Sequence, residues 1–125
     1  MIDFKNGAVF KLKKNKLVSH ASTLNPIMVS GEQIIDEYTA LRDFVVFTNK
    51  RIIAVNVQGI TGTKKDFTSL PYSKIQAFSI ETAGTFDLDA ELEMYFSGLG
   101  KVKFEFSGSS NISAIGKMIS EMILW

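Results

Sequence analysis

An alternation of apolar and polar residues recurs through residues 32–107 and constrains the fold more than any other feature of the sequence. In KVKFEF, which begins at Lys101, every second residue is apolar, and ELEMYF, which begins at Glu91, repeats the pattern. Successive side chains of a β-strand point to opposite faces of a sheet, so a period of two is typical of strands that bury one face. Runs of this kind, bounded by turn residues, predict seven strands at 33–41, 43–48, 51–58, 63–70, 74–82, 89–97 and 101–107.

The end of the chain changes to a helical period. Apolar residues at spacings of three and four predict an amphipathic helix over 109–124. They are Ile112, Ile115, Ile119, Met122 and Ile123. Ser109 or Ser110 is expected to cap this helix, and Gly116 suggests that another element packs closely against its middle. An antiparallel meander of seven strands with one terminal helix predicts a mainly β fold, a roll or partly open barrel capped by the helix.

The last two predicted strands form a hairpin whose register follows from the buried face. A three-residue loop, Gly98 to Gly100, keeps the apolar residues of both strands on one face, whereas a two-residue loop would mix the faces. The predicted partners are Phe96 with Val102, Met94 with Phe104 and Leu92 with Phe106.

The segment DFVVFTNKRIIAV, which begins at Asp43, predicts a second hairpin with Phe47 opposite Ile52. Its strands are apolar on both faces, whereas a strand covered on one side alternates. We therefore expect a second cover besides the core, formed by the C-terminal helix, the N-terminal segment or another subunit. The candidate residues for an interface between subunits are Phe44, Val45, Phe47, Ile53 and Val55.

Composition narrows the classes of function. The chain has 125 residues, a net charge of +1 and no cysteine. A nucleic-acid-binding domain usually carries a basic surplus, and without cysteine there is no disulfide, thiol nucleophile or thiolate metal site. No apolar run approaches the roughly 20 residues that span a bilayer, and the start of the chain lacks the apolar core of a signal peptide. We expect one cytoplasmic domain that does not bind nucleic acid.

The segment QGITGTKK, which begins at Gln58, combines glycine and lysine in the manner of a phosphate-binding loop. That loop requires G-x-x-x-x-G-K-[ST] between a strand and a helix. Counting from Gly59, the sixth position is Lys64 rather than glycine, and the residues that follow are strand-like. The spacing therefore predicts a turn between two strands.

An acidic row in FDLDAELE is the strongest candidate for a metal site. Its carboxylates belong to Asp87, Asp89, Glu91 and Glu93, and on a strand they would share one face that suits a hard cation. An EF-hand loop is not supported, because its sixth position would be Leu92 and its twelfth Gly98. Lys101 and Lys103 on the adjoining strand are expected to neutralise part of the row, so a solvated or interface face is favoured over metal binding.

Residues 1–30 are interpreted as a lysine-rich arm that precedes a domain over 31–125. A basic amphipathic segment binds anionic lipid, to which each lysine contributes about 1 kcal/mol, although a solvated lead-in or a docking arm also fits the pattern. The candidate lipid contacts are Lys11, Lys13, Lys14 and Lys16. His20, the one histidine, has no acidic partner nearby in the sequence and is expected at the surface.

Two longer segments resemble the bacterial pleckstrin-homology domain family. They are GEQIIDEYTALRDFVVFTNKRIIAVNVQGITGTKK from Gly31 and LPYSKIQAFSIETAGTFDLDAELEMYFSG from Leu70. The resemblance is detailed over 31–98 and weaker through the helix. It implies a seven-stranded pleckstrin-like roll with a C-terminal helix, ring-shaped homo-oligomers, specifically pentamers, and no assigned enzymatic activity.

The resemblance does not extend to inositol-phosphate chemistry. Tight binders of that ligand gather several lysines and arginines on the first two strands, whereas YTALRDFVV here offers Arg42 alone, beside Asp43. We therefore predict a non-enzymatic module, without cofactor, that assembles with itself and binds an unidentified protein partner. The alternatives are an anionic-lipid binder that uses the N-terminal lysines and a metal-dependent enzyme that uses the acidic row.

Overall fold

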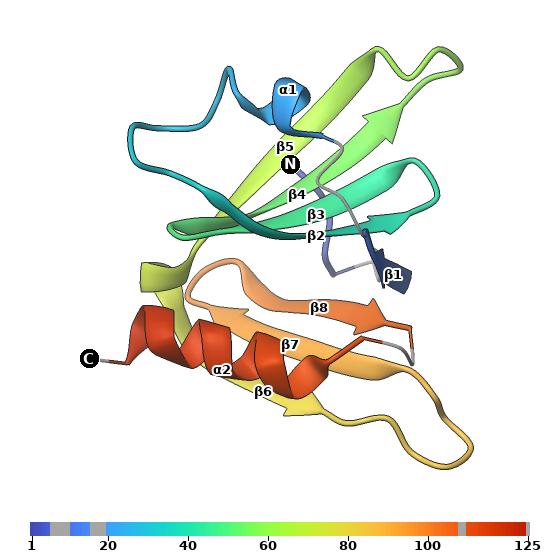
Figure 1. The fold of residues 1–125 in the computed structure, drawn as a ribbon, viewed down its shortest axis with the longest axis vertical. Helices are drawn as coiled ribbons and strands as arrows, with labels where there is room; N and C mark the ends of the chain where they lie inside the picture. Colours follow the sequence, from blue (N-terminus) through green and yellow to red (C-terminus); the bar gives the residue numbers. More distant parts are fainter. Residues whose placement is uncertain (6–10, 16–19, 108–109, 125) are drawn as a thin grey trace.

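A computed structural model describes residues 1–5, 11–15, 20–107 and 110–124. Within these residues eight strands form one open sheet in the order β5-β4-β3-β2-β1-β8-β7-β6 (Figure 1). The elements in chain order are β1 (Lys11–Lys14), α1 (Ala21–Leu24), β2 (Ile34–Ala40), β3 (Asp43–Thr48), β4 (Arg51–Gln58), β5 (Lys64–Pro71), the short 3₁₀ helix η1 (Tyr72–Lys74), β6 (Ile75–Glu81), β7 (Ala90–Phe96), β8 (Gly100–Phe106) and α2 (Ile112–Ile123). The predicted class, mainly β with a C-terminal helix, is confirmed.

Strand β1 was not among the predicted strands and corrects the all-antiparallel topology. It pairs antiparallel with β2 and parallel with β8, so it joins the β2–β5 half of the sheet to the β6–β8 half. The sequence KLKK does not predict a strand, because Leu12 is its one buried residue and a single apolar residue shows no alternation. Residues 1–30 thus contribute a strand to the sheet and Ile2 to the core, while the boundary at residue 31 stays a prediction.

The predicted register is correct in one hairpin and wrong in the other. In β3–β4, Phe47 lies opposite Ile52 as predicted. In β7–β8 the predicted register is wrong by two residues, because Met94 pairs with Val102 and Phe96 with Gly100. A shift of two leaves every side chain on its original face, so the buried pattern cannot distinguish the two registers. The turn distinguishes them, with Gly98 at φ +83° and Gly100 at φ +93°, conformations that glycine adopts readily.

Helix α2 covers the β6–β8 half of the sheet (Figure 1). Its cap is Asn111, whose side chain accepts the backbone N–H of Ala114 at 3.1 Å. The predicted caps are therefore wrong for Ser110, and Ser109 lies outside the described residues. The prediction of close packing at Gly116 is confirmed, since a Cβ there would lie 3.0 Å from Cδ1 of Ile80 on β6.

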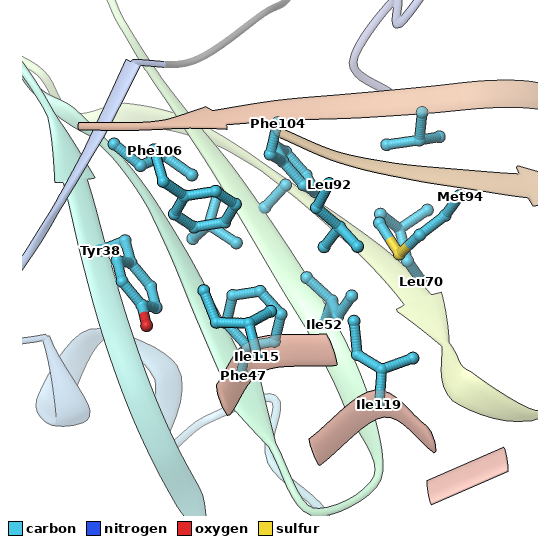
Figure 2. Packing of buried hydrophobic residues seen from close by; sticks show 14 of the residues in the cluster. Tyr38, Phe47, Ile52, Leu70, Leu92, Met94, Phe104, Phe106, Ile115 and Ile119 are labelled. Carbon is cyan, nitrogen blue, oxygen red and sulfur yellow. The ribbon is translucent and has the colours of Figure 1, made fainter. Parts of the chain in front are cut away.

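The main core fills the space between the two halves of the sheet and the helix. In Figure 2, Phe47 and Ile52 from one half face Leu92 and Phe104 from the other, and the helix residue Ile115 points into the same space. Burial of these apolar side chains contributes about 25 cal/mol per Å² removed from water. The helix is therefore part of the core.

Candidate functional site

The outer face of the β3–β4 hairpin carries a second apolar cluster. Residues 20–28 of the N-terminal segment cover it and are called the covering segment from here on. Phe44, Val46, Ile53 and Val55 pack there against the fully buried Leu24 of α1. Of the three covers considered, the N-terminal segment is thus the one that lies over this face. The opposite face, with Val45 and Phe47, belongs to the main core.

All five residues proposed for a subunit interface are consequently at most 1% exposed within the single chain. A neighbouring subunit would reach Phe44, Ile53 or Val55 only if the covering segment moved away. The proposal of an interface at these residues stays a prediction.

His20 is not a plain surface residue as predicted. Its Nδ1 lies 2.8 Å from Oε2 of Glu37, whose side chain is 1% exposed, and its ring stacks on Phe44 with centroids 3.8 Å apart. The side-chain amide of Asn15 also donates to Glu37. These contacts hold the start of the covering segment against β2 and β3. The partners are 17 positions apart, so spacing in the sequence gives no sign of them.

A second buried carboxylate, Glu32, holds the other end of the covering segment. Arg51 donates to it through Nε and Nη2, each at 3.0 Å, and Thr48 donates at 2.7 Å. Arg51 Nη2 also donates to the carbonyl of Ile27 at 2.7 Å. Burial raises the pKa of Glu32, but the hydrogen bonds from Arg51 and its other donors lower it by more, so the pKa lies below its usual value.

Asn49 completes this arrangement from the β3–β4 turn. Its side chain accepts the N–H of Gln33 at 2.7 Å and donates to the carbonyl of Gly31 at 3.0 Å. The segments GEQ, from Gly31, and TNKR, from Thr48, therefore bind each other through side chains. Their polar groups satisfy each other's hydrogen bonds and connect the start of β2 to the β3–β4 turn.

The glycine-rich segment forms a loop between β4 and β5, as predicted. Gly59 and Gly62 have φ of +78° and +68°, in the region that favours glycine. The guanidinium of Arg42 donates to the carbonyl of Gly59, and to that of Val57 at 3.1 Å. The side chain of Arg42 is thus engaged by backbone carbonyls, and the loop precedes a strand instead of the helix that a phosphate loop needs.

The acidic row divides into two parts. Asp87 and Asp89 lie in the loop before β7, while Glu91 and Glu93 lie on β7 itself. The expected neutralisation is confirmed by the ion pairs Lys103–Glu91 at 3.3 Å and Lys101–Glu93 at 3.8 Å. The hydrogen bond to Glu91 raises the pKa of Lys103. Among the described residues no group of three His, Cys, Asp or Glu side chains is placed to hold a metal ion.

Three of the four candidate lipid contacts, Lys11, Lys13 and Lys14, lie on β1. Lys11 pairs with Asp89 at 3.7 Å and Lys14 with Asp36 at 3.2 Å. All three lysines are exposed, and Lys16 lies outside the described residues. No helix in the described part of the chain is long and apolar enough to cross a membrane.

Two surface features were missed in the sequence. The loop between β6 and β7 exposes Phe86 completely and Leu88 by 62%. A hollow of about 380 Å³ lies where β5, η1, β6 and the β7–β8 turn meet. Its apolar lining comprises Leu70, Pro71, Ile75, Phe96 and Leu99. Apolar residues in a predicted loop were the available signal for the first feature, but the hollow depends on how the chain folds.

Comparison of the sequence with known proteins identifies a family and two relatives. The model of the Bacterial PH domain family matches residues 3–123. YjqA of Bacillus subtilis (strain 168) is 40% identical over 119 residues, which cover 86% of this chain and 95% of YjqA. YozO of the same strain is 32% identical over 101 residues, which cover 81% of this chain and 87% of YozO.

A solved structure shows the same fold. A DUF1696-family protein with a pleckstrin-homology domain from Shewanella loihica PV-4 is 40% identical, with a TM-score of 0.79 over 92% of this chain and 99% of that one. The chain therefore belongs to the bacterial PH domain family, and its open sheet with a C-terminal helix is a pleckstrin-homology-like fold.

Proposed function

We propose that this domain acts without catalysis, by associating with copies of itself and binding a protein partner. The observation that carries the proposal is the exposed pair Phe86 and Leu88. Their loop has a defined shape, because the N–H of Gly84 donates to the carbonyl of Asp87 at 2.6 Å and the N–H of Asp89 to its carboxylate at 3.1 Å. Two large apolar side chains exposed within one short loop are candidates for contact with another protein.

The sheet itself supports association. It is open, and β5 and β6 are its two edges. Edge strands present unpaired backbone N–H and C=O groups that another chain can bind. The proposed assembly would cover such groups in addition to the apolar loop.

The polar clusters of the described residues support a role without catalysis. Glu32 and Glu37 are buried and bonded to groups that hold the covering segment, and Glu91 and Glu93 are paired with lysines. A catalytic carboxylate or histidine needs access to a substrate and a pKa suited to proton transfer. These groups instead stabilise contacts between elements of the chain.

The mass of the protein in solution tests the proposal. Size-exclusion chromatography with light scattering at micromolar concentration should give a multiple of 13.9 kDa, and serial dilution should lower it if assembly is reversible. A mass of one chain at every concentration would contradict self-association.

A further inference from the structure

We infer that the hollow beside η1 is a binding site for a small organic carboxylate with an apolar body. The hollow lies at the corner where β5 passes through η1 into β6, and the β7–β8 turn closes its other side. Its volume of about 380 Å³ falls within the range of small-molecule sites. The lining is complete within a single chain, so the site exists whether or not the protein assembles.

The floor of the hollow is apolar and fixed. Leu70 and Phe96, which are 2% and 4% exposed, are core residues that reach its surface. Leu99 packs against the same core, and Pro71 and Ile75 extend the apolar area at the two ends of η1. Aliphatic or aromatic carbon placed here exchanges water for contact with these side chains, which favours binding.

The wall formed by η1 is held in place before any ligand binds. Tyr72, which is 3% exposed, donates from its hydroxyl group to the carbonyl of Thr48 at 2.7 Å. This bond joins η1 to the end of β3 and so positions Ser73 and Lys74, the two polar η1 residues that line the hollow. A preformed wall spares a ligand the cost of ordering it.

The charge of the lining selects an anion. None of the lining residues is acidic, and Lys74 forms no ion pair with any of the residues that the structure describes. An amine ligand would meet this ammonium group without a counter-charge, whereas a carboxylate gains a charge-assisted hydrogen bond from it.

Neutral donors reinforce the preference for an anion. Ser69 accepts a hydrogen bond from Nη1 of Arg51 at 2.9 Å, so its own O–H can donate to a ligand and is polarised by the guanidinium. Ser73 and Ser97 add two more hydroxyl groups to the lining. An apolar floor with a few polar groups at its edge is the arrangement that small-molecule sites commonly have.

A β-bulge at the start of β6 adds a further polar group. Two consecutive residues of β7 pair with Ile75 and Ala77, so Gln76 between them is an extra residue without a partner on β7. Bulges redirect a side chain and interrupt the ladder, and they are over-represented next to active sites. Because Gln76 lines the hollow, its side-chain amide is placed to donate a hydrogen bond to the carboxylate of the ligand.

Titration with small acids tests the site, and the probes are octanoate and phenylacetate. Isothermal titration calorimetry should show saturable binding of one or both, with a Kd of about 1 mM or tighter. Octanamide, which keeps the apolar body without the charge, should bind more weakly than octanoate, and octylammonium should not bind. In NMR spectra of isotope-labelled protein, the acid that binds should shift the amide signals of Lys74, Gln76 and Leu99 and leave that of Ile60 unchanged.

Lys74→Gln tests the role of the charge. It should weaken binding of the acid about tenfold or more, as expected for loss of a charge-assisted hydrogen bond, and leave binding of octanamide unchanged. The matched control is Lys64→Gln, which removes an equal charge at the opposite end of β5, about 20 Å from Pro71, and should bind the acid like the wild type. Ser97→Trp fills the hollow from an exposed position and should abolish binding. Circular dichroism would verify that the variants fold.

The absence of saturable binding by either acid would overturn the inference. Equal binding by the wild type and Lys74→Gln, or amide shifts confined to another surface, would overturn it as well. The mass of the protein decides self-association separately, because a monomer still contains the complete hollow. The carboxylate site and the proposed function can therefore each fail alone.

Discussion

The ion pair between Glu32 and Arg51 allows a prediction whose size follows from burial. The Glu32 side chain is 0% exposed and the Arg51 side chain 19%. Arg51→Met leaves a carboxylate buried without its cation, which costs about 3–5 kcal/mol of unfolding free energy. Glu32→Met should cost less, about 1–3 kcal/mol, because the partly exposed guanidinium can turn toward water. The double variant should be markedly more stable than the sum of the two losses predicts.

Urea unfolding followed by far-UV circular dichroism measures these differences. With a slope of about 2 kcal/mol per molar urea, Arg51→Met should lower the midpoint by about 2 M. Thr48→Val keeps the ion pair but removes one donor to Glu32 and the acceptor of the Lys50 and Arg51 N–H groups, so its loss measures the hydroxyl's contacts separately from the charge. Equal losses in the two single variants, or strictly additive losses in the double variant, would refute the reasoning.

The same pair predicts a dependence on pH. Because the folded pKa of Glu32 lies below its usual 4.5, its contribution is present above that value and is lost as the pH falls through the folded pKa. In Arg51→Met, burial without the cation raises the folded pKa, so this variant should lose less stability in acid than the wild type does. The difference in unfolding free energy between the two proteins should therefore shrink as the pH falls from the raised folded pKa of the variant to the lowered folded pKa of the wild type. A difference that does not change with pH would contradict this account.

Two further predictions concern packing. Gly116→Ala should destabilise the protein by about 1 kcal/mol despite the better helix propensity of alanine, because its Cβ would lie 3.0 Å from Ile80. In an Ile80→Ala background the same change should be neutral or stabilising, and a stabilising Gly116→Ala in the wild type would contradict the close contact. His20→Ala should cost about 1–3 kcal/mol, since it removes a bond to buried Glu37 and the stack on Phe44. Hydrogen exchange should then quicken at Leu24 relative to Leu92, and equal protection of Leu24 in both proteins would argue against this role.

Seven of the eight strands were predictable because each obeys a local rule. The period of two identified β7 and β8, and the two-sided apolar hairpin correctly implied a second cover. The turn near Asn49 and Lys50 correctly placed Phe47 opposite Ile52. The period of two did not fix the β7–β8 register, since a shift of two residues preserves both faces.

The candidate site was less predictable because its residues meet only in the folded chain. The sequence identified glycines, lysines and carboxylates, and correctly excluded a phosphate loop by spacing. It did not indicate that His20 bonds Glu37 or that Arg51 bonds Glu32. The partners are 17 and 19 positions apart, and no local pattern in the sequence relates them. It also did not reveal that the side chain of Phe86 is fully exposed in the folded chain.

The sequence by itself determined seven of the eight strands, the C-terminal helix, the family and the exclusion of several chemistries, since these depend on residue type and spacing along the chain. The tertiary structure alone decided that β1 joins the two halves of the sheet. It also decided which of the three possible covers lies over the outer face of the β3–β4 hairpin, namely the N-terminal segment. The physical reason is that an apolar face requires cover but does not specify which segment supplies it.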